Sequence, residues 1–158
     1  MPNWCLNRVT VCGDEKEVAR FVAAVKGKEE PFDFESILPM PKELKKVQMG
    51  SCTIDGEHVS KWWRKGGKDI KVPAATSMRW LKKYGATNWY DWARINWGTK
   101  WNVSDVELEE QDSECVVYRF ETAWGPPQGI FETLCERFPK LSIEWFYDEP
   151  GNRSAGYL

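Results

Sequence analysis

The sequence contains no run of 18 apolar residues, so we expect no membrane-spanning helix and no membrane partner. Its N-terminal segment lacks a basic stretch followed by an apolar one, the mark of a secretory signal, and a cytoplasmic location is therefore expected. Glycine motifs that cradle phosphates are missing, as is the G-x-S-x-G pattern around a nucleophilic serine. These absences argue against the common nucleotide-hydrolysing and serine-hydrolase classes.

Residues that bind metals or act as nucleophiles are sparse. The five cysteines are widely spaced and form no C-x-x-C pair, so we expect buried free thiols and neither a disulfide framework nor a zinc ribbon. His58 is the only histidine, and its spacing from Cys52 gives no evidence of a catalytic pair. Asp33 and Glu35 would share one strand face, but no histidine or third carboxylate lies near. We therefore predict no metal, no cofactor and no catalytic residue.

Tryptophan, in contrast, is abundant. The chain has ten, and six of them fall between residues 62 and 97. Such a cluster forms either a stacking platform for bases or a compact core, and we favour the core for most of them. A hydrophobic fraction of 42% and a length of 158 residues are typical of one globular domain.

Two ends of the chain carry regular patterns. Residues 4–12 alternate as in a strand, and Asp14 is a suitable N-cap for a helix that Gly27 would stop. Near the other end, residues 101–110 and 114–124 predict a hairpin, followed by a helix over 127–138 and a strand over 141–147. Between them, 32–38 indicates a short strand, and 76–84 and 89–95 indicate helices.

This order, β-α followed by β-β-α-β, predicts an α+β fold. It is the order of a ferredoxin-like β-α-β-β-α-β sandwich, here with a long, partly helical insertion at about 31–100 within a single domain over 1–158. Charge separates the parts: residues 40–102 hold 13 Lys or Arg against 5 Asp or Glu, and the remainder holds 9 against 19. The basic insertion is either an interaction surface or an internal complement to the acidic scaffold.

Several short stretches occur together in a specific order. They are Met1-Pro-Asn-Trp-Cys5, Phe32-Asp-Phe34 running into Ile37-Leu-Pro-Met-Pro41, Asn96-Trp-Gly-Thr-Lys-Trp-Asn102, Phe120-Glu-Thr-Ala-Trp-Gly-Pro-Pro127, Phe138-Pro and Tyr147-Asp-Glu-Pro-Gly151. In this combination the chain resembles the YubB-like ferredoxin-like family of plasmid and phage proteins.

The resemblance implies an accessory protein of a mobile element in a bacterial host, with a ferredoxin-like scaffold and no iron–sulfur cluster. It supplies no catalytic residues, because the family has no settled activity. Two features depart from the pattern. Similar proteins continue past the equivalent of Ala155-Gly156 with a further strand or domain, whereas this sequence ends at Leu158, and the segment from Gly50 to Lys71 is particular to this chain.

The segment 96–102 is the first candidate site. It precedes a predicted strand, and its small centre suits a recognition loop. Lys100 would hold an anion or a carbonyl between Trp97 and Trp101, and Trp124 is expected at the same end of the sheet. These four are the candidate partner-binding residues. The alternative interpretation, which we favour for this segment, is a structural turn in which Gly98 permits the bend and the indoles plug the end of the sandwich.

The segment 61–71 is the second candidate site. It interleaves five cations with two indoles, and cations contact phosphates while indoles stack on bases. The candidate nucleic-acid-binding residues are Lys61, Trp62, Trp63, Arg64, Lys65, Lys68 and Lys71. The alternative, which we favour, is a solvated mobile loop with the two indoles packed back onto the domain, because the acidic chain, with a pI near 5.6, lacks an overall basic footprint.

We predict a non-enzymatic accessory binding protein of a phage or plasmid that acts by protein–protein interaction. The expected partner is a host or phage protein, with components of host defence among the candidates. A nucleic-acid-binding module that uses the basic, Trp-rich insertion is the alternative, and a small hydrolase or nuclease is the third hypothesis.

Overall fold

The computed structural model describes residues 3–158, without the side chains of residues 50–52, 57, 59 and 60. The first two residues, which begin the Met1-to-Cys5 stretch, lie outside the described part. The chain divides into two compact units. Unit 1 comprises Met1–Pro39 and Asn96–Leu158, and unit 2 comprises Met40–Ile95. None of the helices in the described part is long and apolar enough to cross a membrane.

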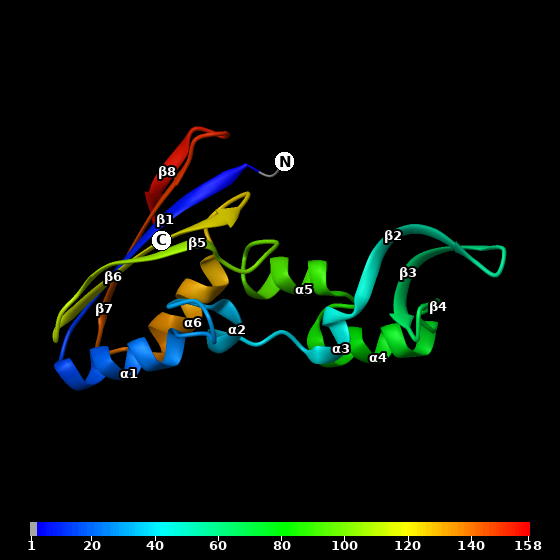
Figure 1. Cartoon of the computed structure of the whole chain (residues 1–158), viewed down its shortest axis with the longest axis horizontal. Helices are drawn as coiled ribbons and strands as arrows, with labels where there is room; N and C mark the ends of the chain where they lie inside the picture. The colour runs from blue at the N-terminus through cyan, green and yellow to red at the C-terminus, as the bar shows by residue number, and fades with distance from the viewer. Residues whose placement is uncertain (1–2) are drawn as a thin grey trace. The chain divides into compact units, whose positions relative to one another are not determined.

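Unit 1 is built on a five-stranded antiparallel sheet in the order β5-β6-β1-β7-β8. Helices α1 and α6 lie on one face of this sheet (Figure 1). The elements of unit 1 are β1 (Trp4–Cys12), α1 (Glu15–Val25), α2 (Phe34–Ile37), β5 (Ser104–Gln111), β6 (Cys115–Ala123), α6 (Gln128–Arg137), β7 (Ser142–Glu149) and β8 (Ser154–Tyr157). The edge strand β8 was not among the sequence predictions.

The first strand and helix follow from local sequence, and both predictions are confirmed. Alternate residues of β1, beginning with Cys5, are buried against the helices. The Asp14 side chain accepts a hydrogen bond from the Lys16 backbone N–H and caps α1. The helix then buries Val18 and Phe21 at the spacing of one helical face.

The core of unit 1 is an aromatic cluster under the sheet. Phe32 stacks on Phe120 with ring centroids 5.0 Å apart, and Trp145 meets Phe120 edge-on at 5.5 Å. Phe34 packs against Phe32 at 6.3 Å, and all four side chains are fully buried. Aromatic side chains bury more apolar area than any others, so these rings anchor the two chain segments that form unit 1.

The strand predicted over 32–38 is wrong, because this segment contains the short helix α2. Asp33 caps that helix by accepting from the Glu35 backbone N–H at 2.9 Å. It also accepts from Asn102 Nδ2 at 2.7 Å, while Asn102 Oδ1 accepts from the Phe34 N–H. A tertiary hydrogen bond from a distant segment therefore reinforces the cap.

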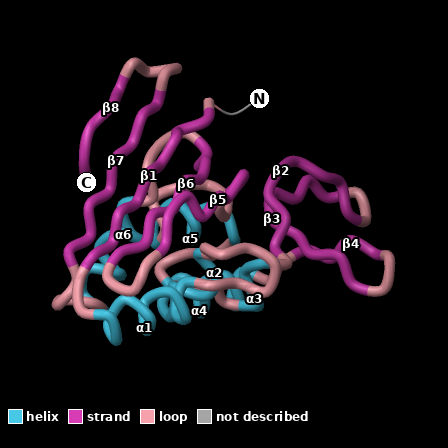
Figure 2. The backbone as a smooth tube through the Cα atoms, turned by 60° about the vertical axis from the view of Figure 1, so that its left-hand side comes forward, coloured by secondary structure: helices cyan, strands magenta, loops and turns pink. Residues whose placement is uncertain are grey.

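Unit 2 combines a three-stranded antiparallel sheet, β2-β3-β4, with short helices (Figure 2). Its elements are α3 (Lys42–Lys45), β2 (Val47–Ile54), β3 (Glu57–Lys65), β4 (Lys68–Lys71), α4 (Ala74–Tyr84) and α5 (Trp89–Asn96), whose last residue belongs to unit 1. The helices predicted over 76–84 and 89–95 are confirmed as α4 and α5.

The interpretation of 61–71 as a mobile loop is wrong. These residues form most of the β3–β4 hairpin, which turns at Gly66-Gly67. The β2–β3 hairpin turns at Asp55-Gly56 in the same way. All four turn residues have positive φ, the geometry of the tight turns that match the twist of antiparallel strands. Gly-Gly and Asp-Gly were thus hairpin signals in the sequence.

The expectation of free thiols is wrong for one pair of cysteines. Cys12 and Cys115 face each other in the register of β1 and β6 and form a disulfide. Cys5 is buried as a free thiol, and Cys135 is half-buried and free. Strand pairing brings together two cysteines that are 103 residues apart, which sequence spacing alone does not indicate.

Candidate functional site

The segment 96–102 is largely structural. Trp97 is 3% exposed, and its indole Nε1 donates a hydrogen bond to the carbonyl of Leu38 at 2.8 Å. Thr99 Oγ1 donates to the carbonyl of Ala123 at 2.7 Å, which ties the segment to the end of β6. Trp97 therefore belongs to the core and does not form a wall of an exposed recognition site.

The two other residues predicted in this segment are at the surface. Lys100 Nζ lies 4.2 Å from the centre of the Trp101 ring, a cation–π contact. The Trp101 ring lies 6.2 Å from that of Trp4, and the two indoles are 38% and 37% exposed. Residues from the two chain segments of unit 1 thus place two indoles and a cation together.

Trp124 is the most exposed indole of unit 1 that the structure describes, at 56%. Its φ is +77°, in the left-handed region that bulky residues rarely adopt. The strain costs roughly 1–3 kcal/mol and is typical of functional positions. The Trp124 backbone N–H donates to the Asn3 carbonyl, and Ala123 pairs with Trp4, so this residue adjoins Trp4 along the sheet end. We call Trp4, Trp101 and Trp124 the indole surface.

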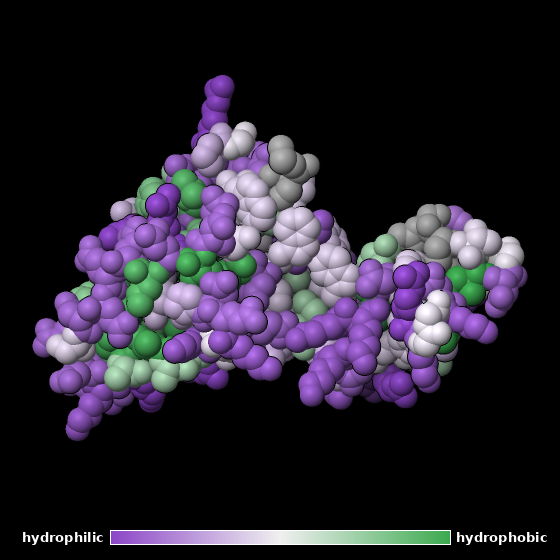
Figure 3. All heavy atoms as spheres, viewed as in Figure 1, coloured by the Kyte–Doolittle hydropathy of each residue, from purple (hydrophilic) through white to green (hydrophobic). Residues whose placement is uncertain are grey.

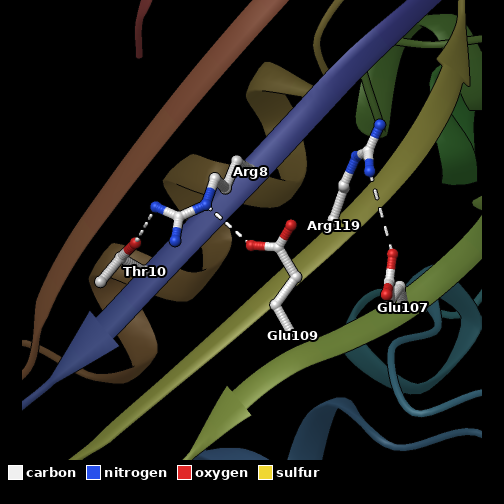
Figure 4. A network of polar contacts seen from close by, with 5 residues as sticks. All are labelled: Arg8, Thr10, Glu107, Glu109 and Arg119. Atoms are coloured by element: carbon white, nitrogen blue, oxygen red, sulfur yellow. Dashed lines mark hydrogen bonds and ion pairs between the residues drawn. The ribbon is translucent and has the colours of Figure 1, made fainter.

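The sheet face opposite the helices carries charged side chains. Arg8 Nε donates to Glu109 Oε2 at 2.8 Å, and Arg119 lies 3.9 Å from Glu107 (Figure 4). Both arginines are about half exposed, so these pairs contribute little to stability. Their role is to offset part of a larger negative charge on this face.

Strand register adds further carboxylates to the same face. Glu121 and Asp148 lie opposite Leu6 on the two strands that flank β1, and Glu144 lies opposite Thr10. Carboxylates therefore outnumber arginines there. A phosphate backbone laid across this face would meet net repulsion.

Part of the basic set predicted for nucleic acid is engaged within unit 2. Lys61 Nζ donates to Thr87 Oγ1 at 2.6 Å. The Arg64 guanidinium makes two hydrogen bonds to the Asp69 carboxylate, at 2.8 and 3.2 Å, which raise its pKa and lower that of Asp69. These contacts stabilise the β3–β4 hairpin and leave fewer cations available for phosphate.

Of the remaining residues predicted to bind nucleic acid, the two tryptophans are partly buried and the three lysines are exposed to solvent. Trp63 packs against Trp80 with ring centroids 5.7 Å apart, and both Trp62 and Trp63 are half-buried. The side chains of Lys65, Lys68 and Lys71 are exposed to solvent. The structure therefore brings the predicted residues onto one hairpin, with the indoles only partly accessible.

Sequence reasoning missed a cavity in unit 2. Its volume is about 590 Å³, and Figure 3 shows hydrophilic residues gathered over α3 and α4, which contribute to its walls. It is lined by Lys42, Glu43, Lys46, Trp63, Arg64, Lys65, Thr76, Arg79, Trp80, Lys83 and Tyr84. Four of these residues, at positions 76, 79, 80 and 83, have the spacing of one helical face of α4. This spacing was the signal in the sequence that could have indicated the cavity wall.

The nucleophile and metal candidates form no reactive site in the described part of the chain. Burial raises the pKa of the Cys5 thiol to about 11, so the thiol is protonated at neutral pH. His58 is exposed and pairs in strand register with Thr53, whereas the Cys52 side chain lies outside the described residues. Among the residues described, His, Cys, Asp and Glu form no group that could hold a metal.

Comparison with known proteins bears on the fold. Residues 96–158 match the family described as "Ferredoxin-like domain in Api92-like protein", which assigns a ferredoxin-like domain to this part of the chain. The whole chain is similar to the crystal structure of the protein api92 from Yersinia pseudotuberculosis, with a TM-score of 0.57 and 12% identity over 99% of this chain and 93% of that one. At this identity the likeness shows the fold alone. No curated protein matches the chain.

Proposed function

We propose that the chain is a non-enzymatic binding protein whose partner, another protein, contacts the indole surface of unit 1. The observation that carries this proposal is the conformation of Trp124. Its backbone adopts a strained positive φ, and its indole is exposed to solvent. Glycine adopts positive φ without penalty, so a tryptophan at this position favours a role for its exposed side chain.

The composition of the surface supports a protein partner. Tryptophan is enriched among the residues that dominate protein–protein binding energy, because a rigid indole buries a large area at small entropic cost. Trp4 and Trp101 present two such rings close together, Trp124 presents a third next to Trp4 along the backbone, and Lys100 adds a cation over the Trp101 ring. The neighbouring acidic face favours a partner with a basic rim, since complementary charge speeds encounter.

We also place the chain among the accessory proteins of phages and plasmids, with a host or phage protein, such as a component of host defence, as its partner. The support is the resemblance carried by the ordered sequence stretches. For the fold, we infer a β-α-β-β-α-β sandwich interrupted by unit 2. The supports are the chain order β1, α1, β5, β6, α6, β7 and the sheet order β5-β6-β1-β7, with β8 added at the edge.

Replacing Trp124 by glycine is expected to separate binding from stability. Glycine relieves the strain at φ +77° but gains entropy in the unfolded chain, so the free energy of unfolding should change by less than about 1 kcal/mol. Loss of an exposed anchor should weaken partner binding by about 2 kcal/mol, or about thirtyfold. Trp101→Ala should act in the same direction. Quantitative mass spectrometry after pull-down from a bacterial host lysate identifies the partner, and titration with that partner measures the loss.

The matched control is Tyr157→Ala, which removes a ring that is 65% exposed on the edge strand β8, separated from β1 in the sheet by β7. It should leave binding unchanged. A partner that the Trp124→Gly and Trp101→Ala proteins bind as tightly as the unaltered protein does would refute the proposal.

A further inference from the structure

We infer that the cavity of unit 2 binds a nucleotide, meaning a ligand that joins phosphate groups to a planar base. This site is separate from the proposed indole surface, because every residue that lines it lies within Met40–Ile95. Its volume of about 590 Å³ falls in the range of small-molecule sites, roughly 300–1,000 Å³. A nucleotide fits this size, whereas an extended nucleic acid strand would have to continue beyond it.

The charge of the lining calls for a polyanion. Six Lys or Arg side chains line the cavity against one carboxylate, that of Glu43. Arg64 is already paired with Asp69, but Lys46, Lys65 and Arg79 form no ion pair with any residue that the structure describes. Six like charges around one cavity create a positive potential there, which attracts an anion of several charges. Phosphate groups provide that charge, and they accept hydrogen bonds from several cations at once.

The same walls contain rings, which a simple anion would not need. Trp63 and Tyr84 line the cavity and are half-buried, so part of each ring is accessible. Trp63 packs against Trp80, which also lines the cavity, and Lys83 Nζ lies 4.7 Å from the centre of the Tyr84 ring. Bases stack on such rings, and a cation beside the ring can hold the attached phosphate. Cations and rings on the same walls are what distinguish a nucleotide site from a general basic patch.

The full chain should bind ATP with a Kd below about 100 µM in isothermal titration calorimetry at physiological salt. Inorganic tripolyphosphate, which carries the charge without the base, should bind at least about tenfold more weakly, and adenosine, which carries the base without charge, weaker still. A single-stranded oligonucleotide of mixed sequence serves as the nucleic-acid arm and should bind no more tightly than ATP.

Two double variants separate the site from overall charge. Lys42→Ser with Lys83→Ser removes one lining cation each from α3 and α4, and should weaken ATP binding by about thirtyfold or more. Lys45→Ser with Lys82→Ser removes the same charge from the same two helices at exposed positions that do not line the cavity, and should change affinity less than threefold. Tyr84→Leu keeps the apolar bulk and should cost about tenfold for ATP but little for tripolyphosphate.

Four results would overturn the inference. They are equal affinity for ATP and tripolyphosphate, equal losses in the two double variants, binding of the oligonucleotide without binding of ATP, and absence of any ATP binding by the unaltered chain. Should Lys42→Ser with Lys83→Ser fail to fold, the comparison of ATP with tripolyphosphate on the unaltered chain still decides the question. Binding of the partner protein to the indole surface is measured independently of all of these.

Discussion

Trp145→Ala should lower the free energy of unfolding by about 3–5 kcal/mol, the usual cost of deleting a large aromatic side chain from a packed core. Trp145 is fully buried and meets the rings of Phe32, Phe120 and Phe131. Its indole Nε1 also donates to Asn7 Oδ1 at 3.0 Å. The substitution therefore opens a cavity and removes the donor to a buried amide at once. Equilibrium denaturation in urea measures the change.

Trp145→Phe isolates the polar part of this effect. Phenylalanine retains a ring but leaves Asn7 Oδ1 without its indole donor, so the cost should be about 1–3 kcal/mol. Asn7 is itself held by donating to the Cys5 carbonyl and to Thr122 Oγ1, so it cannot turn to find another donor. The control is Trp4→Ala, which removes an exposed indole and should cost less than about 1 kcal/mol. A cost for Trp145→Ala no larger than that of Trp4→Ala would contradict the packing described for the core.

Local patterns predicted the elements that local interactions determine. The alternation over residues 4–12 corresponds to β1, and the cap at Asp14 begins α1, because both depend on neighbours within a few residues. The same holds for the hairpin of β5 and β6, whose tip is set by Asp112 accepting from the N–H groups of Glu114 and Cys115. Long-range contacts were needed where the predictions were wrong. Nothing near α2 indicates that a distant asparagine will complete its cap.

The tryptophan-rich segment shows why density in sequence was a poor guide to the binding surface. Of its six indoles, Trp80, Trp92 and Trp97 are buried and the others are half-buried. The exposed indoles of unit 1 lie far apart in the chain, at 4, 101 and 124, and strand pairing brings their backbones to one end of the sheet. The pairing of β1 with β6 joins segments that are distant in the sequence, so local patterns did not indicate that Trp4 lies beside Trp124. The sequence predicted only that Trp124 lies at the same end of the sheet as segment 96–102.

Reduction of the Cys12–Cys115 disulfide should lower the free energy of unfolding by about 2–5 kcal/mol. The bond joins residues 103 apart, and a cross-link over a long loop removes much conformational freedom from the unfolded chain. For a chain of this size each kcal/mol corresponds to about 2–4 °C in the melting temperature, so a fall of roughly 4–20 °C is expected. Calorimetry with and without a reductant measures it, and Cys12→Ser with Cys115→Ser should reproduce the reduced value.

The other cysteines supply a control for this prediction. Cys135→Ser changes a free, half-buried thiol and should leave the response to reductant intact. Before reduction, a thiol reagent added to the denatured protein should find two of the five cysteines unreactive. If all five react and the reductant leaves the melting temperature unchanged, the pair is reduced in solution. The core would then hold β1 against β6 without a covalent link, as expected for a protein kept in a reducing compartment.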